Sequence, residues 1–292
     1  MTATGLFPRR VHLDERLEPG FAKRLEAKLA GLGVEPGRGP SGSLTVSTYA
    51  ALQDAAIEHL AILFDGKLGQ EHSQALRRTP PALLLACRAP DGALAEWELG
   101  ALAAFVTGDS LVPATGLSRE FPLRQMPDIE NAAAQTETFV RAAGGGSYPA
   151  AAAADVMHEL AANALLDAPT NPDGSKRYAH RRHEAPTIAP EDAARARIVV
   201  SGEHIYLQAA DRFGGLGPEP VAAALSQQGG RVHLNPDGGG AGLGILRMVD
   251  QSDLTVFRVA RGRRCEVTCV VSAENVRRRS ARPKSIWFLA VP

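Results

Sequence analysis

A carboxylate and an amide stand four residues apart at Glu159 and Asn163, inside an alanine-rich segment that has the composition of a helix. A spacing of four places both side chains on one helix face. Carboxylate and amide oxygens together can hold Mg²⁺ and orient a water molecule. The same pair also fits an ordinary solvated polar stripe, so it needs support from other motifs.

A second polar motif begins at Asp211, directly after a strand-like run, Tyr206–Ala210. A carboxylate at a strand end can accept a hydrogen bond from an exocyclic amine. Gly215 and Gly217 follow it and would let a flat base lie close to the backbone. The alternative interpretation is a simple turn that ends the strand.

The third motif is a glycine run, Asp237–Ile245, with five glycines within seven residues and an apolar helical run after it. A glycine loop that opens a helix presents free N–H groups to an anion, and the helix dipole favours negative charge there. The run therefore predicts phosphate binding. It follows a long Pro- and Gln-containing segment and does not come directly after a first strand, which argues against a Rossmann or P-loop site.

Taken in this order, the three motifs resemble the GHKL ATP-binding fold that is shared by gyrase, heat-shock chaperones, histidine kinases and MutL. The similarity covers about residues 125–275. Its N-box matches Glu159 and Asn163, its first glycine box matches Asp211, Gly215 and Gly217, and its second glycine box matches Gly240, Gly242 and Gly244.

The resemblance implies that ATP and Mg²⁺ are the cofactors. Asn163 would ligate Mg²⁺, Asp211 would contact the adenine amine, and the second glycine box would wrap the phosphates. Glu159 would be the catalytic residue that polarises an attacking water or hydroxyl group. Residues 218–239 would form a lid over the nucleotide.

Three positions depart from the family pattern. Phe213 stands where the first glycine box has its first glycine. Asp167 replaces the histidine or tyrosine that often follows the asparagine, and Arg264-Cys265 occupies the usual Gly-Thr region. These departures leave open whether the nucleotide is consumed or only held.

The approach to the N-box is similar to that of the anti-sigma-factor serine kinases. It runs from Phe121-Pro-Leu through Asp128-Ile-Glu and a helix to a glycine break. This resemblance implies a homodimer that captures a partner protein, a regulator or a sigma-factor-like target, in which Glu159 would activate a partner serine. Two alternatives remain: a non-catalytic interaction module with a degenerate nucleotide pocket, or a histidine-kinase-like protein that lacks its own phospho-acceptor domain.

The N-terminal part resembles a degenerate response-regulator receiver domain. Apolar strand-like runs alternate there with helical patterns, which predicts a parallel sheet with helices on both faces. Asp14 and Glu15 follow the first run and Asp65 follows the third, so the resemblance implies a receiver-type Mg²⁺ and phosphorylation site at these acids. The fifth strand is expected at residues 105–113. No Lys follows there, and Cys87-Arg88 replaces the usual Thr or Ser, so a pseudo-receiver is predicted.

We therefore expect an α/β plus α+β fold in three parts. Residues 1–115 form the receiver-like parallel sheet, and residues 116–275 form a Bergerat-type two-layer α/β sandwich. Residues 276–292 form a basic and aromatic C-terminal tail.

Composition adds limits on partners and location. The 292 residues carry 32 Lys+Arg and 32 Asp+Glu, so no global charge draws the chain to nucleic acid or membrane. No apolar stretch approaches the roughly 20 residues of a spanning helix, and the first residues lack a signal-peptide core. The three cysteines show no metal-ligand spacing and are expected to be packed, reduced thiols. A cytoplasmic bacterial signalling protein is the resulting expectation.

Overall fold

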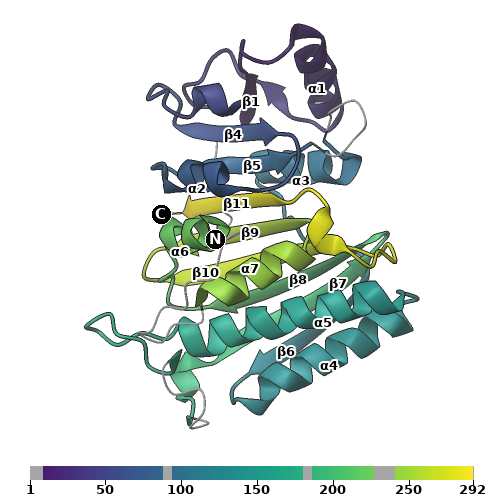
Figure 1. Ribbon diagram of the computed structural model, residues 1–292, viewed down its shortest axis with the longest axis vertical. Coiled ribbons are helices and arrows are strands. Elements are labelled where there is room, and N and C mark those ends of the chain that lie inside the picture. Colours follow the sequence, from purple (N-terminus) through teal and green to yellow (C-terminus); the bar gives the residue numbers. More distant parts are fainter. Residues whose placement is uncertain (1–8, 88–93, 180–185, 227–240, 292) are drawn as a thin grey trace.

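One mixed β-sheet runs through the whole molecule (Figure 1). The computed structural model describes residues 9–87, 94–179, 186–226 and 241–291. In this part of the chain, eleven strands lie in the order β2-β1-β3-β4-β5-β11-β9-β10-β8-β7-β6. The sheet therefore joins segments from both ends of the sequence.

The N-terminal half contributes parallel strands. They are β1 (Arg10–Leu13), β2 (Glu35–Pro36), β3 (Leu44–Ser47), β4 (His59–Phe64) and β5 (Leu83–Ala86). The central strands are buried along almost their whole length, as expected for parallel strands covered on both faces. The helices of this half are α1 (Pro19–Gly31), α2 (Gln70–Arg77) and α3 (Glu96–Thr107).

The C-terminal half contributes an antiparallel sheet. Its strands are β6 (Leu117–Leu123), β7 (Ala194–Ser201), β8 (His204–Asp211), β9 (Leu254–Ala260) and β10 (Arg264–Ser272). Helices α4 (Pro127–Ala142), α5 (Ser147–Ala162), α6 (Pro218–Ser226) and α7 (Ala241–Gln251) lie in front of it in Figure 1. The predicted fold class, a parallel α/β unit followed by a two-layer α/β unit, is confirmed.

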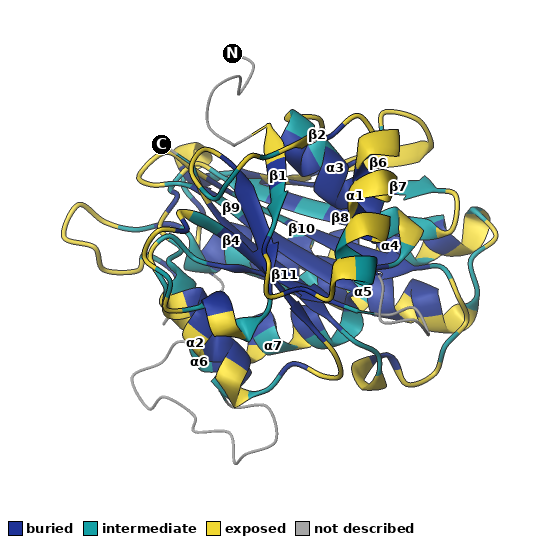
Figure 2. Ribbon diagram, turned by 90° about the horizontal axis from the view of Figure 1, so that it is seen from above, coloured by how far each residue is buried: buried dark blue, intermediate teal, exposed yellow. Residues whose placement is uncertain are grey.

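The last strand, β11 (Ser285–Val291), lies in the middle of the sheet. It pairs in parallel with β9 along its full length and antiparallel with β5 at Ile286. The tail predicted for residues 276–292 thus contains the strand that joins the two halves. Its side chains are apolar on both faces, so both faces must be covered. Figure 2 shows β11 as a buried band among the helices.

Two hydrophobic clusters occupy opposite faces of this sheet, because side chains alternate along each strand. On β11, Ile286 and Phe288 join the cluster under α2 and α4–α7. Trp287 and Leu289 join the cluster under α1 and α3. Each face therefore carries one core that extends across both halves of the chain.

The N-terminal half differs from a receiver domain in two respects. Residues 105–113 do not form the expected fifth strand. Helix α3 runs to Thr107 and ends at Gly108, which has a left-handed φ of 83°. The position beside β5 is taken instead by β11, in the opposite direction. The sequence pattern missed this because the partner of β5 comes from about 200 residues further along the chain, where Ile286 pairs with Leu84.

We predict that Trp287→Ala lowers the free energy of unfolding by about 3–5 kcal/mol, the usual cost of emptying a large buried aromatic site. Trp287 is 1% exposed and lies 5.9 Å from the ring of Phe105. Urea unfolding measures the change. Tyr148→Ala, at a side chain 43% exposed, is the matched control and should change stability by less than about 1 kcal/mol. Equal effects of the two substitutions would contradict a central role for β11.

Candidate functional site

Helix α5 brings the first predicted pair to the face of the sheet. Most of its alanines are buried and let the helix lie close against β7, β8 and β10. At Asn163 the α-helix changes into a π-helical turn, Asn163–Asp167, in which the N–H of Ala168 donates to the carbonyl of Asn163 at 2.8 Å. Such turns are rare and occur frequently at functional sites.

Helix α7 packs closely against this pair. An added Cβ at Gly244 would lie 2.7 Å from Glu159 Oε2 and 3.6 Å from Asn163 Oδ1, so a side chain here would require the Glu159 carboxylate to move. Arg247 Nη1 donates to Glu159 Oε1 at 3.0 Å, and this hydrogen bond raises the pKa of Arg247. The amide nitrogen of Asn163 faces Met248 Sδ at 3.9 Å.

Asp211 stands at the end of β8, as the sequence predicted. Its Oδ1 accepts the backbone N–H groups of Phe213 at 2.8 Å and Gly214 at 3.2 Å. Burial raises the pKa of Asp211, and the backbone donors act in the opposite direction by stabilising the ionised form. The carboxyl group is therefore fixed in orientation by the loop that follows it.

Gly214, which the sequence reasoning did not select, holds that loop in place. Its φ is +59°, and an added Cβ would lie 2.0 Å from the carbonyl oxygen of Ala260. Gly262 N–H donates back to the Gly214 carbonyl at 3.3 Å. The Gly214-Gly215 doublet after a strand was the available signal, but the contact with the β9–β10 turn is not visible in the sequence.

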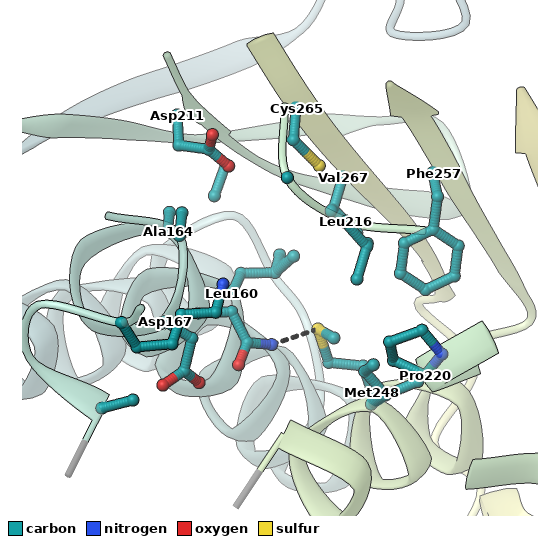
Figure 3. A pocket seen from close by; sticks show the side chains of 17 residues that line it. Leu160, Ala164, Asp167, Asp211, Leu216, Pro220, Met248, Phe257, Cys265 and Val267 are labelled. Carbon is teal, nitrogen blue, oxygen red and sulfur yellow. Dashed lines mark hydrogen bonds between the residues drawn. The ribbon is translucent and has the colours of Figure 1, made fainter. Parts of the chain in front are cut away.

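A cavity of about 260 Å³ lies between the sheet and the helices, close to the lower end of the usual ligand-pocket range. Figure 3 shows Asp211, Cys265 and Val267 on the sheet side, facing Ala164 and Asp167. The chain brings together three predicted residues in its lining: Asn163, Asp211 and Gly215.

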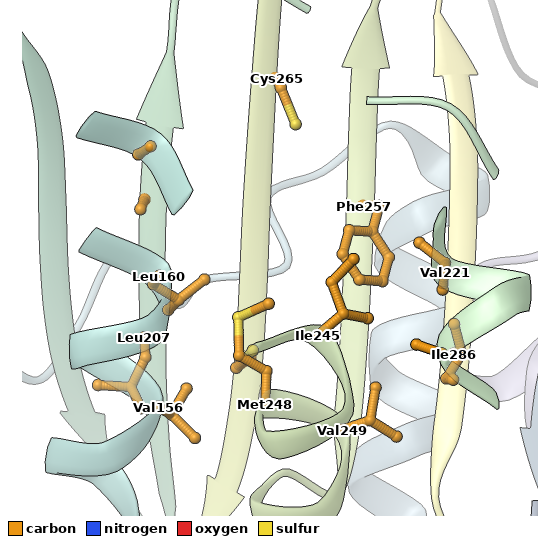
Figure 4. Close-up of a cluster of buried hydrophobic side chains, with 14 of the residues drawn as sticks. Val156, Leu160, Leu207, Val221, Ile245, Met248, Val249, Phe257, Cys265 and Ile286 are labelled. Atoms are coloured by element: carbon orange, nitrogen blue, oxygen red, sulfur yellow. The ribbon is translucent and has the colours of Figure 1, made fainter. Parts of the chain in front are cut away.

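The floor of the cavity is apolar. Leu160, Ile245, Met248 and Phe257 extend from the cavity into the buried cluster drawn in Figure 4. Cys265 also lines the cavity, and burial raises the pKa of its thiol to about 12. It is therefore a protonated, packed thiol, as is Cys269, whose pKa burial raises to about 11.

The other predicted residues lie around this cavity. Glu159 is beside the first turns of α7, where Gly242 and Gly244 also lie. Gly217 immediately precedes α6. Gly240 and most of the segment predicted as a lid, residues 227–240, lie outside the described residues. Arg247 was missed, because no local pattern indicates which distant carboxylate an arginine will meet.

The site chemistry fits an adenine nucleotide with Mg²⁺. The half-buried Asp211 carboxylate borders a mostly apolar cavity, which would suit a base that carries an exocyclic amine. At the other end, Asn163 Oδ1 and Glu159 border the first turn of α7, where backbone N–H groups lack helical partners and favour phosphate. An amide oxygen beside a phosphate-attracting helix start is a suitable Mg²⁺ ligand.

The receiver-type acids are not brought together. The parallel strands of this half lie in the order 2-1-3-4-5, which is also the order in a receiver. The short strand β2, which the sequence pattern did not predict, makes β4 the fourth strand, so Asp65 follows β4 and β3 separates β4 from β1, the strand that precedes Asp14. Asp14 is buried and binds Arg16 at 2.7 Å, while Glu15 and Asp65 are exposed. Across the described ranges, no group of three His, Cys, Asp or Glu side chains could hold a metal ion. The expected metal and phosphorylation site at these acids is therefore not assembled.

Comparisons with known proteins add little. No family model and no curated protein matches the chain. One similar solved structure is described as the crystal structure of the SiaB-SiaC complex from Pseudomonas aeruginosa. It is 14% identical, the match covers 53% of this chain and 88% of that chain, and the TM-score is 0.33. Within the described residues, no helix is both long and apolar enough to cross a membrane. Function must be argued from the site itself.

We predict that Gly214→Ala destabilises the protein by about 2 kcal/mol or more, because alanine is strained at positive φ and its Cβ would meet backbone that cannot rotate away. Chemical unfolding followed by circular dichroism checks this. The neighbouring Gly215→Ala is the matched control, since an added Cβ there meets nothing within 4 Å. If both variants unfold at the same denaturant concentration, the loop is not held in the way described.

Proposed function

We propose that the C-terminal half binds ATP with Mg²⁺ between the sheet and helices α5–α7, and that the protein is a signalling protein which controls a partner protein. The observation that carries the proposal is the cavity that unites Asn163 with Asp211 and Gly215, which come from two distant segments of the chain. Residues of two motifs of the resemblance line this cavity, and Gly244 of the third motif lies against Glu159, which supports a common ligand.

Each residue then has a distinct task. Asp211 accepts a hydrogen bond from the adenine amine, and its loop keeps the carboxylate aimed at the base. The apolar floor, including Met248 and Phe257, covers the face of the base. Asn163 offers an oxygen to Mg²⁺, and the glycines at the start of α7 let the backbone approach the phosphates. Bound ATP would supply a phosphoryl group for transfer.

Glu159 is the group placed to take a proton from a hydroxyl nucleophile, such as a serine of the partner. It is 13% exposed and is held by Arg247 at 3.0 Å. Glu159 can accept a proton only when Arg247 turns away from it, for example toward a phosphate. The serine-kinase activity, the partner and the homodimer remain predictions from the resemblance, and the cytoplasmic location remains a prediction from the composition.

A second function is favoured by the same ion pair. If Arg247 keeps Glu159 neutralised with nucleotide bound, the protein is a binding module that holds ATP without consuming it. Phe213 stands where the first glycine box has a glycine, so the contact that this glycine makes in the family is altered; its ring centroid lies 5.8 Å from the guanidinium carbons of both Arg177 and Arg212.

Calorimetry with ATP and MgCl₂ tests the pocket. We expect Asp211→Asn to weaken ATP binding by about tenfold or more, because the variant loses a charge-assisted hydrogen bond and places an amide donor opposite an amine. Asp109→Asn, the same substitution at an exposed acid of the N-terminal half, should bind as the wild type does. No heat with the wild-type chain would refute the nucleotide proposal.

Transfer from labelled ATP to proteins that co-purify with the chain separates the two functions. A kinase should lose transfer in Glu159→Gln while keeping its ATP affinity, because the base is removed and the pocket remains. Arg247→Ala should keep or increase transfer, since it releases Glu159 from its partner. If neither the wild type nor Arg247→Ala transfers label from ATP, the serine-kinase function is refuted and the binding module is supported.

A further inference from the structure

Helix α6 contributes Pro220 to the wall of the cavity. It begins directly after the Asp211–Gly217 loop, and its Pro220 lines the cavity together with Leu216. The preceding residue, Glu219, is exposed and contacts helix α2. The position of this short helix therefore decides the shape of the pocket wall.

Helix α2 of the N-terminal half is the element that supports α6. Helices α2 and α6 pack side by side (Figures 1 and 2). Ala75 and Leu76 of α2 belong to the same buried cluster as Val221 and Leu225 of α6. The cluster continues into Ile245 and Met248, which line the cavity. The pocket wall is thus packed against a helix from the other half of the chain.

A charged fork fixes the two helices to each other. Arg77 Nε donates to the two Glu219 oxygens at 3.2 and 3.0 Å, and Arg77 Nη2 donates to Oε1 at 2.9 Å. Arg77 Nη1 also donates to Ser73 Oγ at 2.9 Å, and Ser73 Oγ donates to the Gln70 carbonyl at 2.7 Å. Two-point contact between planar groups sets orientation as well as distance.

The Arg77–Glu219 fork alone contributes little to the free energy of unfolding, because the two side chains are 39% and 66% exposed. Its importance lies in the orientation of helix α6 relative to α2. An isolated helix of nine residues is not stable in water, so α6 depends on its packing for its position. The residues that hold it from the N-terminal side are therefore able to change the pocket without touching a ligand.

We propose that Arg77 is a positioning residue for the nucleotide: through Glu219 it holds α6, and with it the Pro220 wall, against the cavity. This role rests on the proposed nucleotide site. It gives the N-terminal half a function that the receiver resemblance did not supply. Ligand binding and the contact between α2 and α6 are then linked, so each strengthens the other.

Calorimetry with ATP and MgCl₂ on the full chain tests the proposal. Arg77→Glu places two carboxylates together and should weaken ATP binding by about three- to tenfold. The charge-swapped double variant, Arg77→Glu with Glu219→Arg, restores the attraction and should recover most of the lost affinity. A purely structural loss would not be rescued in this way.

Lys28→Glu is the matched control. It breaks another cross-helix ion pair of the N-terminal half, Lys28 with Glu96 at 2.7 Å, which has no contact with the cavity. Its ATP affinity should equal that of the wild type. If Arg77→Glu does not fold, Glu219→Gln removes the same fork from the exposed side and should weaken binding by up to about fivefold.

Hydrogen exchange provides an independent readout. ATP should slow amide exchange in α2 as well as in α6 of the wild type, and Arg77→Glu should lose the protection in α2. A wild type that binds ATP with Arg77→Glu unchanged overturns the role of Arg77 and leaves the nucleotide site standing. A wild type that does not bind ATP overturns both proposals.

Discussion

The insertion of β11 between β5 and β9 is the constraint on which the structure depends. This strand is apolar on both faces, so it must lie where both faces are covered. It hydrogen-bonds with β9 along seven residues and reaches β5 at Ile286. Since it is the last strand of the chain, the sheet is continuous only when the C-terminal segment returns to the middle.

The common sheet places helices from both halves on the same face. Helix α2 lies beside α6, and both belong to the core that extends beneath α7 and α5. A pocket in the C-terminal half therefore has a wall supported from the N-terminal half. Two separate domains joined by a linker would not give this arrangement, because their cores would be independent.

Two carboxylates of the site are held by different means, and this suits different tasks. Asp211 is fixed by backbone N–H groups at the end of a strand, where only small movements are possible. Glu159 is held by Arg247, a long side chain that is 59% exposed and can turn toward another anion. A fixed acceptor suits recognition of a base, and a releasable one suits a step that must be controlled.

The sequence by itself determined the local features. Strand runs, the alanine-rich helix, the shared face of Glu159 and Asn163, and Asp211 at a strand end all follow from residues a few positions apart. It also indicated the mixed fold class. The two-residue strand β2 leaves no visible pattern, so the sequence pattern makes the strand before Asp65 the third, although it is the fourth, and β3 lies between the strands that precede Asp14 and Asp65.

Only the tertiary structure decided which distant segments meet. The central place of β11, the Arg247–Glu159 pair, the contact of Gly214 with Ala260 and the Arg77–Glu219 fork each join residues that no local pattern connects. The physical reason is that hydrophobic periodicity and secondary-structure propensity depend only on residues a few positions apart in the sequence. Contacts between distant segments depend on which apolar faces and charged groups meet once the whole sheet has assembled.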